Sequence, residues 1–195
     1  MLKSIKQICG DKLGASDGEV GHVKDFYFDD KRWVIRYVVA DTGTWLPSRQ
    51  VLSSPHVFKS LYQPGKVLIV NLTRKQIENS PSIDTHKPVS RQYEEDYYRY
   101  YGWPSYWEGD FIWGLGGFPL VTANSIPCAT AGAAKKSGQT EHSDAHLRSA
   151  QAVIGYQIKA GAETIGSVMD FLVEDKSWVM GRLGTIFSIS MAMAC

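Results

Sequence analysis

The residue types that most often carry catalysis or bind metals are present, but their spacing does not bring them together. None of the histidines belongs to an H-E-x-x-H motif or to another ligand spacing. The five are His22, His56, His86, His142 and His146. No Ser-His-Asp set can be assembled, and the glycines at 114, 116 and 117 are not followed by the Lys-Ser/Thr of a phosphate loop. The sequence therefore predicts no catalytic residue, no metal ligand and no cofactor, and thus no enzyme.

Acidic pairs fall between apolar runs. Asp29 and Asp30 follow one such run, and Glu174 and Asp175 follow another. Aspartate is typical of turns because its side chain accepts hydrogen bonds from nearby backbone. Turn formation explains these pairs more simply than a duplicated carboxylate site.

Charge and cysteine content exclude several classes of protein. The 195-residue chain has 21 basic and 20 acidic side chains and a net charge of +1, so no global field favours nucleic acid or an anionic membrane. Cys9, Cys128 and Cys195 are few, odd in number and far apart, which indicates reduced thiols. The N-terminus has no secretory signal, and no run of about 18 apolar residues predicts a transmembrane segment. We expect a cytoplasmic protein.

The stretch from Gly18 to Pro47 predicts the central β-structure. Residues 19–28 and 33–39 read as strands joined by a charged turn, and a second turn at residues 41–44 leads to a third strand that continues through 49–53. An antiparallel meander follows from this order. Gly21 lies inside the first strand, where glycine often marks a bulge or a bend, which favours a small barrel over a flat sheet.

Later segments predict one more strand and two helical stretches. Residues 66–72 form a short apolar run after a Pro-Gly turn. Thr73 with Gln76 has the form of a capping box that opens a helical turn. Residues 90–101 are the best helix candidate, with Ser90 as the N-cap and Gly102 as the terminating residue.

A shift of 145 residues superimposes the start of the chain on its C-terminal part. It gives ten identities over residues 10–34, where average composition would give roughly one or two by chance. We interpret this as an internal repeat. The residues that define it most clearly are Gly21, Asp25, Phe26 and Trp33, matched by Gly166, Asp170, Phe171 and Trp178. We expect Asp25 and Asp170 to accept hydrogen bonds from turn backbone.

The motifs GEVGHVKDFYFDD (residues 18–30), WVIRYVVADTG (33–43) and WLP (45–47) resemble the PRC-barrel family. This family includes the cytoplasmic domain of the photosynthetic reaction-centre H subunit and the C-terminal domain of the ribosome maturation factor RimM. Residues 71–81, 84–101 and 102–107 resemble a bacterial subfamily of tandem PRC-barrel proteins. The resemblance implies a mainly β fold, a small antiparallel PRC-type β-barrel with a second, incomplete copy and one short helix between them.

The repeat and the resemblance together predict four parts. Residues 1–80 form the first barrel, 81–121 a helix and an aromatic-rich connecting segment, 122–147 a flexible linker rich in small polar residues, and 148–195 the incomplete second copy. About 30 residues of the first copy have no counterpart in the second, and the match decays from about residue 181, which suggests truncation or an altered reading frame. Exposed strand edges would then favour a homo-oligomer.

An aromatic-rich segment is the candidate interaction surface. Its residues are Tyr93, Tyr97, Tyr101, Trp103, Tyr106, Trp107 and Trp113. Three interpretations stay open: these rings cover the end or seam of a barrel, they dock a protein partner, or they stack on bases or sugars. Acidic neighbours such as Glu95, Glu108 and Asp110 repel phosphate, so no nucleic acid is favoured.

By resemblance, the sequence predicts a non-enzymatic PRC-barrel scaffold that mediates protein–protein interaction, as the reaction-centre H-subunit barrel does. The partner is a protein of unknown identity. An RNA- or ribosome-associated factor of the RimM type is the alternative, and a small-molecule binding protein of unknown chemistry is the second alternative.

Overall fold

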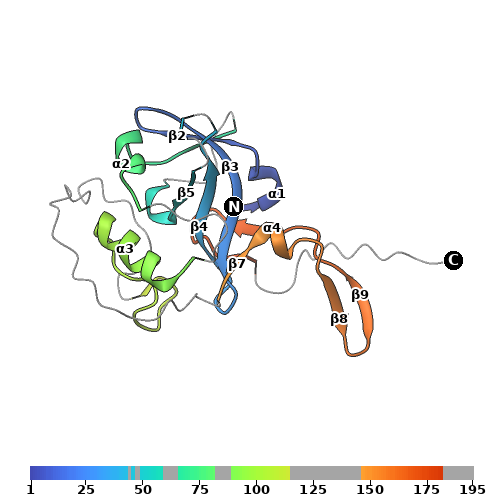
Figure 1. Cartoon of the computed structure of the whole chain (residues 1–195). Coiled ribbons are helices and arrows are strands. Elements are labelled where there is room, and N and C mark those ends of the chain that lie inside the picture. The colour runs from blue at the N-terminus through green and yellow to red at the C-terminus, as the bar shows by residue number, and fades with distance from the viewer. Residues whose placement is uncertain (44, 47–48, 59–65, 82–88, 115–145, 182–195) are drawn as a thin grey trace.

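The computed structural model is mainly β and describes residues 1–43, 45–46, 49–58, 66–81, 89–114 and 146–181 (Figure 1). Its strands are β1 (Leu2–Ser4), β2 (Lys12–Ala15), β3 (Gly18–Asp29), β4 (Val34–Asp41), β5 (Gln50–Ser53), β6 (Val67–Ile69), β7 (Leu147–Ser149), β8 (Gln157–Ala160), β9 (Glu163–Ser167) and β10 (Leu172–Glu174). Its helices are α1 (Ile5–Ile8), the 3-10 turn η1 (Pro55–Val57), α2 (Arg74–Glu78), α3 (Arg91–Tyr101) and α4 (Ala150–Val153).

The largest sheet has the strand order β5-β4-β3-β2-β6, and β7 pairs with one end of β3. The β2–β3, β3–β4 and β4–β5 ladders are antiparallel, whereas β6 runs parallel to β2. The predicted meander is therefore confirmed. Apolar residues of β3 and β4 form the centre of the core, where Phe26, Ile35 and Val38 are fully buried. β4 is buried on both faces, because every residue from 34 to 40 is buried.

The bend predicted at Gly21 is a β-bulge. Leu13 pairs with Gly21 while Gly14 pairs with Glu19, so β3 carries one extra residue at this point. A Cβ on Gly21 would lie 1.9 Å from the carbonyl oxygen of Asp41, which no side chain tolerates. Among the described residues no ladder joins β5 to β6, so the sheet is mixed and open and does not show the closed barrel that the sequence predicts.

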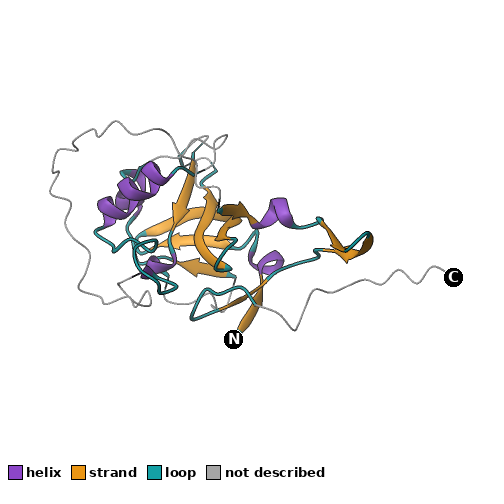
Figure 2. Ribbon diagram, turned by 90° about the horizontal axis from the view of Figure 1, so that it is seen from below, coloured by secondary structure: helices purple, strands orange, loops and turns teal. Residues whose placement is uncertain are grey.

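The two predicted helical stretches form where their capping residues indicate. Thr73 and Gln76 make a complete capping box at the start of α2. Ser90 caps α3, and Gly102 ends it in the left-handed conformation with φ of 68°. α3 lies on the side of the large sheet opposite the β8–β9 hairpin (Figures 1 and 2).

The first strand of each sequence repeat pairs with the other repeat. β1 forms an antiparallel ladder with β10, and β7 forms one with residues 27–29 of β3. The 145-residue shift converts the first ladder into the second. These ladders run across the boundaries predicted at residues 80 and 148, so each half completes a sheet of the other.

The β1–β10 and β3–β7 ladders form a junction between the two halves of the chain. Two carboxylates make equivalent contacts across this junction. The Ser149 hydroxyl donates to Asp25 over 2.5 Å, and the backbone N–H of Gln151 donates to it over 3.1 Å. In the same way the Ser4 hydroxyl and an N–H of α1 donate to Asp170. The sequence predicted bonds to turn backbone. Each aspartate does accept a hydrogen bond from the backbone N–H of the next residue. Its other hydrogen bonds come from donors in the opposite half of the chain.

Trp33 and Trp178 occupy equivalent turns. Their φ angles are 55° and 57°, in the left-handed region that non-glycine residues rarely adopt. The Ile35 N–H donates to the Trp178 carbonyl over 2.9 Å, and the Met180 N–H donates to the Trp33 carbonyl over 2.8 Å. The two tryptophans thus have matching backbone surroundings at the centre of the junction.

Two segments with sequence predictions lie outside the described residues. They are most of the linker expected at residues 122–147 and the C-terminal tail from residue 182.

Candidate functional site

Aromatic side chains from η1, α3 and the loop that follows α3 form one cluster, which we call the aromatic cluster. Its members are His56, Tyr93, Tyr97, Tyr98, Tyr101, Trp103, Tyr106, Trp107 and Trp113. Neighbouring ring centroids lie 4.5 to 6.1 Å apart, and most pairs meet edge to face. This geometry is typical of aromatic packing in a protein core.

The structure corrects the candidate interaction surface at four of its seven positions. Tyr97, Tyr101, Tyr106 and Trp113 are at most 6% exposed, so they belong to the core and offer no area to a partner. Tyr97 also donates its hydroxyl to the Leu52 carbonyl and thereby joins α3 to the sheet. The sequence shows aromatic content but not which face of α3 meets the sheet, and this contact decides the burial.

The other three positions, Tyr93, Trp103 and Trp107, are only partly buried and pack against the outside of the cluster. The guanidinium of Arg91 lies 4.4 Å from the centre of the Trp107 ring, which is a cation–π contact. A partner can therefore reach the edge of the aromatic cluster but not its centre.

A buried arginine stabilises the cluster from the sheet side. Arg36 lies within β4 and is fully buried, and its guanidinium pairs with Asp29 over 3.1 Å. It also donates to the Ile112 carbonyl over 2.8 Å and lies 4.0 Å from the centre of the Tyr106 ring. A buried charge needs such partners because desolvation is costly. Sequence reasoning missed Arg36, although an arginine in the apolar run VIRYVV was a usable signal.

A buried glutamate plays the matching role on α3. Glu94 is fully buried and accepts hydrogen bonds from the Tyr37 hydroxyl at 2.8 Å and the Tyr106 hydroxyl at 2.6 Å. Its other oxygen pairs with Arg91 over 3.0 Å. Burial, and next the Glu94 charge, raise the pKa of both tyrosines, which therefore stay protonated as donors. The carboxylate is thus held by structural contacts.

His56 is the histidine that lies within the cluster. It stacks on Trp103 with ring centroids 5.1 Å apart, and its Nδ1 lies 2.9 Å from the Ser54 hydroxyl. Burial, with a smaller effect of the Arg36 charge, lowers the pKa of His56 to about 4. At neutral pH the imidazole is uncharged and enclosed by rings, which suits packing better than proton transfer.

The loop after α3 is fixed in place yet exposes apolar side chains. Arg32 donates to the carbonyls of Phe111 at 2.8 Å, Gly109 at 3.3 Å and Tyr106 at 3.4 Å. Phe111 is nevertheless 68% exposed and Ile112 is 45% exposed. Sequence reasoning missed this pair, because exposure depends on the arginine contacts rather than on composition.

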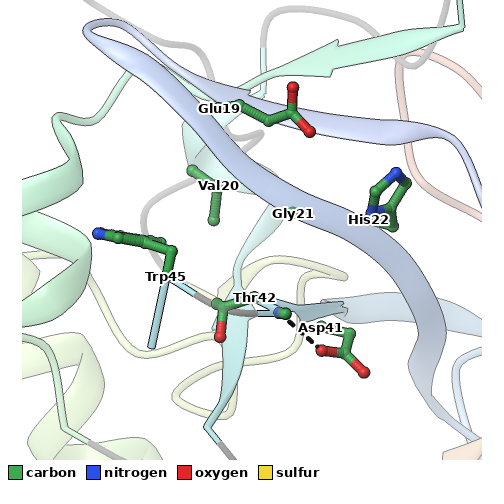
Figure 3. Close-up of a pocket in the computed structure, with 8 residues that line it drawn as sticks. Glu19, Val20, Gly21, His22, Asp41, Thr42 and Trp45 are labelled. Carbon is green, nitrogen blue, oxygen red and sulfur yellow. Dashed lines mark hydrogen bonds between the residues drawn. The ribbon is translucent and has the colours of Figure 1, made fainter. Parts of the chain in front are cut away.

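A pocket of about 550 Å³ lies between the start of β3 and the turn after β4 (Figure 3). It is lined by Glu19, Val20, Gly21, His22, Asp41, Thr42, Gly43 and Trp45. Figure 3 shows Val20 directed toward Trp45 and Thr42, and Asp41 bonded to the Gly43 N–H. The pocket combines carboxylates, one imidazole and one indole, but no nucleophile–base pair is formed by them.

Among the described residues, no group of three or more His, Cys, Asp or Glu side chains could hold a metal ion. None of the helices seen there is long and apolar enough to cross a membrane. Cys9 is a free thiol whose pKa is raised, chiefly by burial, so it is mostly protonated at neutral pH.

No protein-family model matches the chain, and no curated protein is similar to it in sequence.

Proposed function

We propose that the protein is a non-enzymatic, protein-binding scaffold of the PRC-barrel type. The observation that carries this proposal is the exposed pair Phe111 and Ile112. Three hydrogen bonds from Arg32 and one from Arg36 fix the backbone around them. Exposed apolar side chains on a fixed backbone require little further ordering of that backbone on binding, which suits an interface anchor.

The surroundings of this pair indicate the chemistry of the partner. Trp107 lies partly exposed within the same segment, and the exposed residues Glu108 and Asp110 lie between it and Phe111 in the sequence. An apolar partner surface with Lys or Arg at its rim is complementary to this arrangement. The same carboxylates disfavour a phosphate backbone, so the RNA-binding alternative receives no support from this surface.

The PRC-barrel part of the proposal is supported by the sequence motifs and by the matching junction contacts of the two halves. The strand order in which β3 pairs with β2 and β4 is compatible with a barrel that is not fully closed. The matching pairs Asp25/Asp170 and Trp33/Trp178 support an origin by duplication. We also retain a cytoplasmic location as part of this proposal.

The test is a crosslinking pull-down from bacterial lysate with a photoreactive phenylalanine analogue at position 111. The captured protein is identified, purified and titrated against the chain. Phe111→Ser with Ile112→Ser should weaken this binding at least tenfold. Leu2→Ser, at another exposed apolar side chain, is the matched control. Equal affinity of the double variant, with an unchanged circular dichroism spectrum, refutes the proposal. Capture of RNA instead of a protein, with an affinity that falls steeply as salt is added, would instead indicate binding to phosphate.

The pocket of Figure 3 favours a second candidate function, the binding of a small molecule. Its volume falls in the range of ligand pockets, and Trp45 offers a ring for stacking. A thermal-shift screen of small molecules tests this function. A ligand that raises the melting temperature of the natural chain should lose its effect on Trp45→Ala, whereas no hit, or a hit that persists in this variant, counts against the pocket.

A further inference from the structure

The β8–β9 hairpin is a separate two-stranded sheet that projects from the body of the molecule (Figures 1 and 2). Among the described residues no third strand pairs with either of its edges. Tyr156 is 60% exposed, Ile165 43% and Met169 41%. An isolated two-stranded hairpin is marginally stable in water, and this one also exposes apolar side chains.

The same hairpin occurs in the first half of the chain. The β2–β3 ladder joins Lys12 to His22 and Leu13 to Gly21, and the β8–β9 ladder joins Gln157 to Ser167 and, one step on, residue 158 to residue 166. Both ladders carry an irregularity at the next position, and a shift of 145 residues superimposes them throughout. The two hairpins thus have one register.

The two hairpins are buried to different extents. Leu13 and Val20 of the first hairpin are at most 1% exposed, whereas Ile165, the counterpart of Val20, is 43% exposed. One clear difference is that β6 pairs with the outer edge of β2. Leu68 of β6 lies opposite Leu13 in a parallel ladder and is itself 2% exposed. Nothing described covers the equivalent edge of β8.

The backbone groups that face this edge follow from the first hairpin. The N–H of Lys12 donates to the Lys66 carbonyl over 3.0 Å, and the Gly14 carbonyl accepts from the Val70 N–H over 2.8 Å. The corresponding outward groups of β8 are the N–H of Gln157 and the carbonyl of residue 159. Unpaired groups of this kind on a strand edge are a template for a further strand.

We propose that the outer edge of β8 binds an extended apolar segment of a partner protein as an added parallel strand. The segment places a Leu or Ile side chain beside Ile158, as β6 places Leu68 beside Leu13. Recognition combines backbone hydrogen bonds, which supply affinity, with alternate apolar side chains, which supply selectivity. This inference rests on the proposed protein-binding function and assigns it a second surface.

The probe is a synthetic peptide of residues 66–72, KVLIVNL, because this segment already fills the equivalent position beside β2. It is titrated into the full ¹⁵N-labelled chain and followed by amide chemical shifts. We expect saturable shifts at residues 157–160 and slowed hydrogen exchange at Gln157. A peptide with proline in place of its Leu68 should not bind, because proline lacks the donor N–H.

Gln157→Pro is the decisive variant, because it removes the outward N–H while the pairing of residue 158 with β9 is retained. It should weaken peptide binding about tenfold or more, as expected for one lost hydrogen bond. Lys159→Ala, which keeps every backbone donor, is the matched control and should bind normally. Unchanged binding by Gln157→Pro, with residues 163–167 still showing strand shifts, overturns the proposal.

The remaining outcomes are also decisive. No shift at residues 157–160 at millimolar peptide refutes the added strand. Shifts that depend on protein concentration without peptide would identify a second copy of the chain as the occupant and would overturn the proposal of a different partner. If the Phe111 variants bind their partner more weakly but the peptide causes no shifts in β8, only the proposal of an added strand fails. If the Phe111 variants bind normally, the proposed function fails independently.

Discussion

His56 gives the protein a predicted loss of stability in mild acid. The imidazole stacks on Trp103, with Trp113 edge-on at 5.6 Å, and its pKa is lowered to about 4, mainly by burial. In the unfolded chain the pKa of a histidine is about 6.5. Between these two values the unfolded state binds a proton that the folded state does not. The stabilisation is therefore present above pH 6.5 and is lost as the pH falls toward 4.

The size of the effect follows from the pKa difference. A difference of about 2.5 pKa units corresponds to a loss of about 2.5 kcal/mol between pH 7 and pH 4.5. Because His56 is not completely enclosed, solvent screening makes this an upper bound and we expect about 2 kcal/mol. For a domain of ordinary stability, on the order of 5–15 kcal/mol, such a loss is readily measured.

The assay is urea unfolding, followed by far-ultraviolet circular dichroism, at several pH values from 7.5 to 4.5. The natural chain is compared with His56→Gln, and His22→Gln controls for the loss of an exposed histidine. As the pH falls, the natural chain should lose about 2 kcal/mol more of its free energy of unfolding than His56→Gln does. A constant difference, or a His56 resonance that titrates near pH 6.5 in the folded protein, would refute the reasoning.

Three further predictions concern buried contacts, each measured as the free energy of unfolding in urea. Glu94→Leu should cost about 3–5 kcal/mol because it leaves two tyrosine hydroxyls without an acceptor, whereas Glu94→Gln should cost about half as much. A smaller loss in Glu94→Leu than in Glu94→Gln would contradict the buried network. Gly21→Ala should cost at least about 3 kcal/mol, against less than about 1 kcal/mol for the control Gly14→Ala, whose Cβ would meet nothing closer than 3.7 Å. Equal costs would exclude the close approach to Asp41. Ser149→Ala and Ser4→Ala should each cost about 1–2 kcal/mol, since each hydroxyl also caps a helix; a loss at one site alone would show that the junction is not symmetric.

Local chemistry was sufficient to predict the individual elements. The enrichment in Val, Phe and Tyr predicted β3, two largely apolar faces predicted β4, and the capping residues Ser90 and Thr73 predicted where α3 and α2 begin. These features depend on neighbours in sequence. The same holds for Asp29, whose side chain accepts from two backbone N–H groups of the turn, as its position indicated.

Tertiary partners could not be predicted in the same way. The 145-residue shift showed that two segments are similar but not that β1 pairs with β10 and β7 with β3. The aromatic composition of residues 93–113 was compatible with both a docking surface and a core. The answer depends on buried partners: Arg36 contacts the rings of Tyr106 and Trp113, and Glu94 accepts a hydrogen bond from Tyr106. These rings are buried, whereas Phe111 is exposed.

The exchange of first strands has a consequence for synthesis on the ribosome. Residues 27–29 of β3 leave the exit tunnel more than a hundred residues before their partner β7 leaves it. At a synthesis rate of about 5–20 residues per second, this edge of β3 stays unpaired for roughly 6–25 seconds. Throughout that interval the nascent chain offers an open β-edge to any neighbouring nascent chain. Translation must therefore reach the last quarter of the chain before the β3 edge in the first quarter can pair with β7.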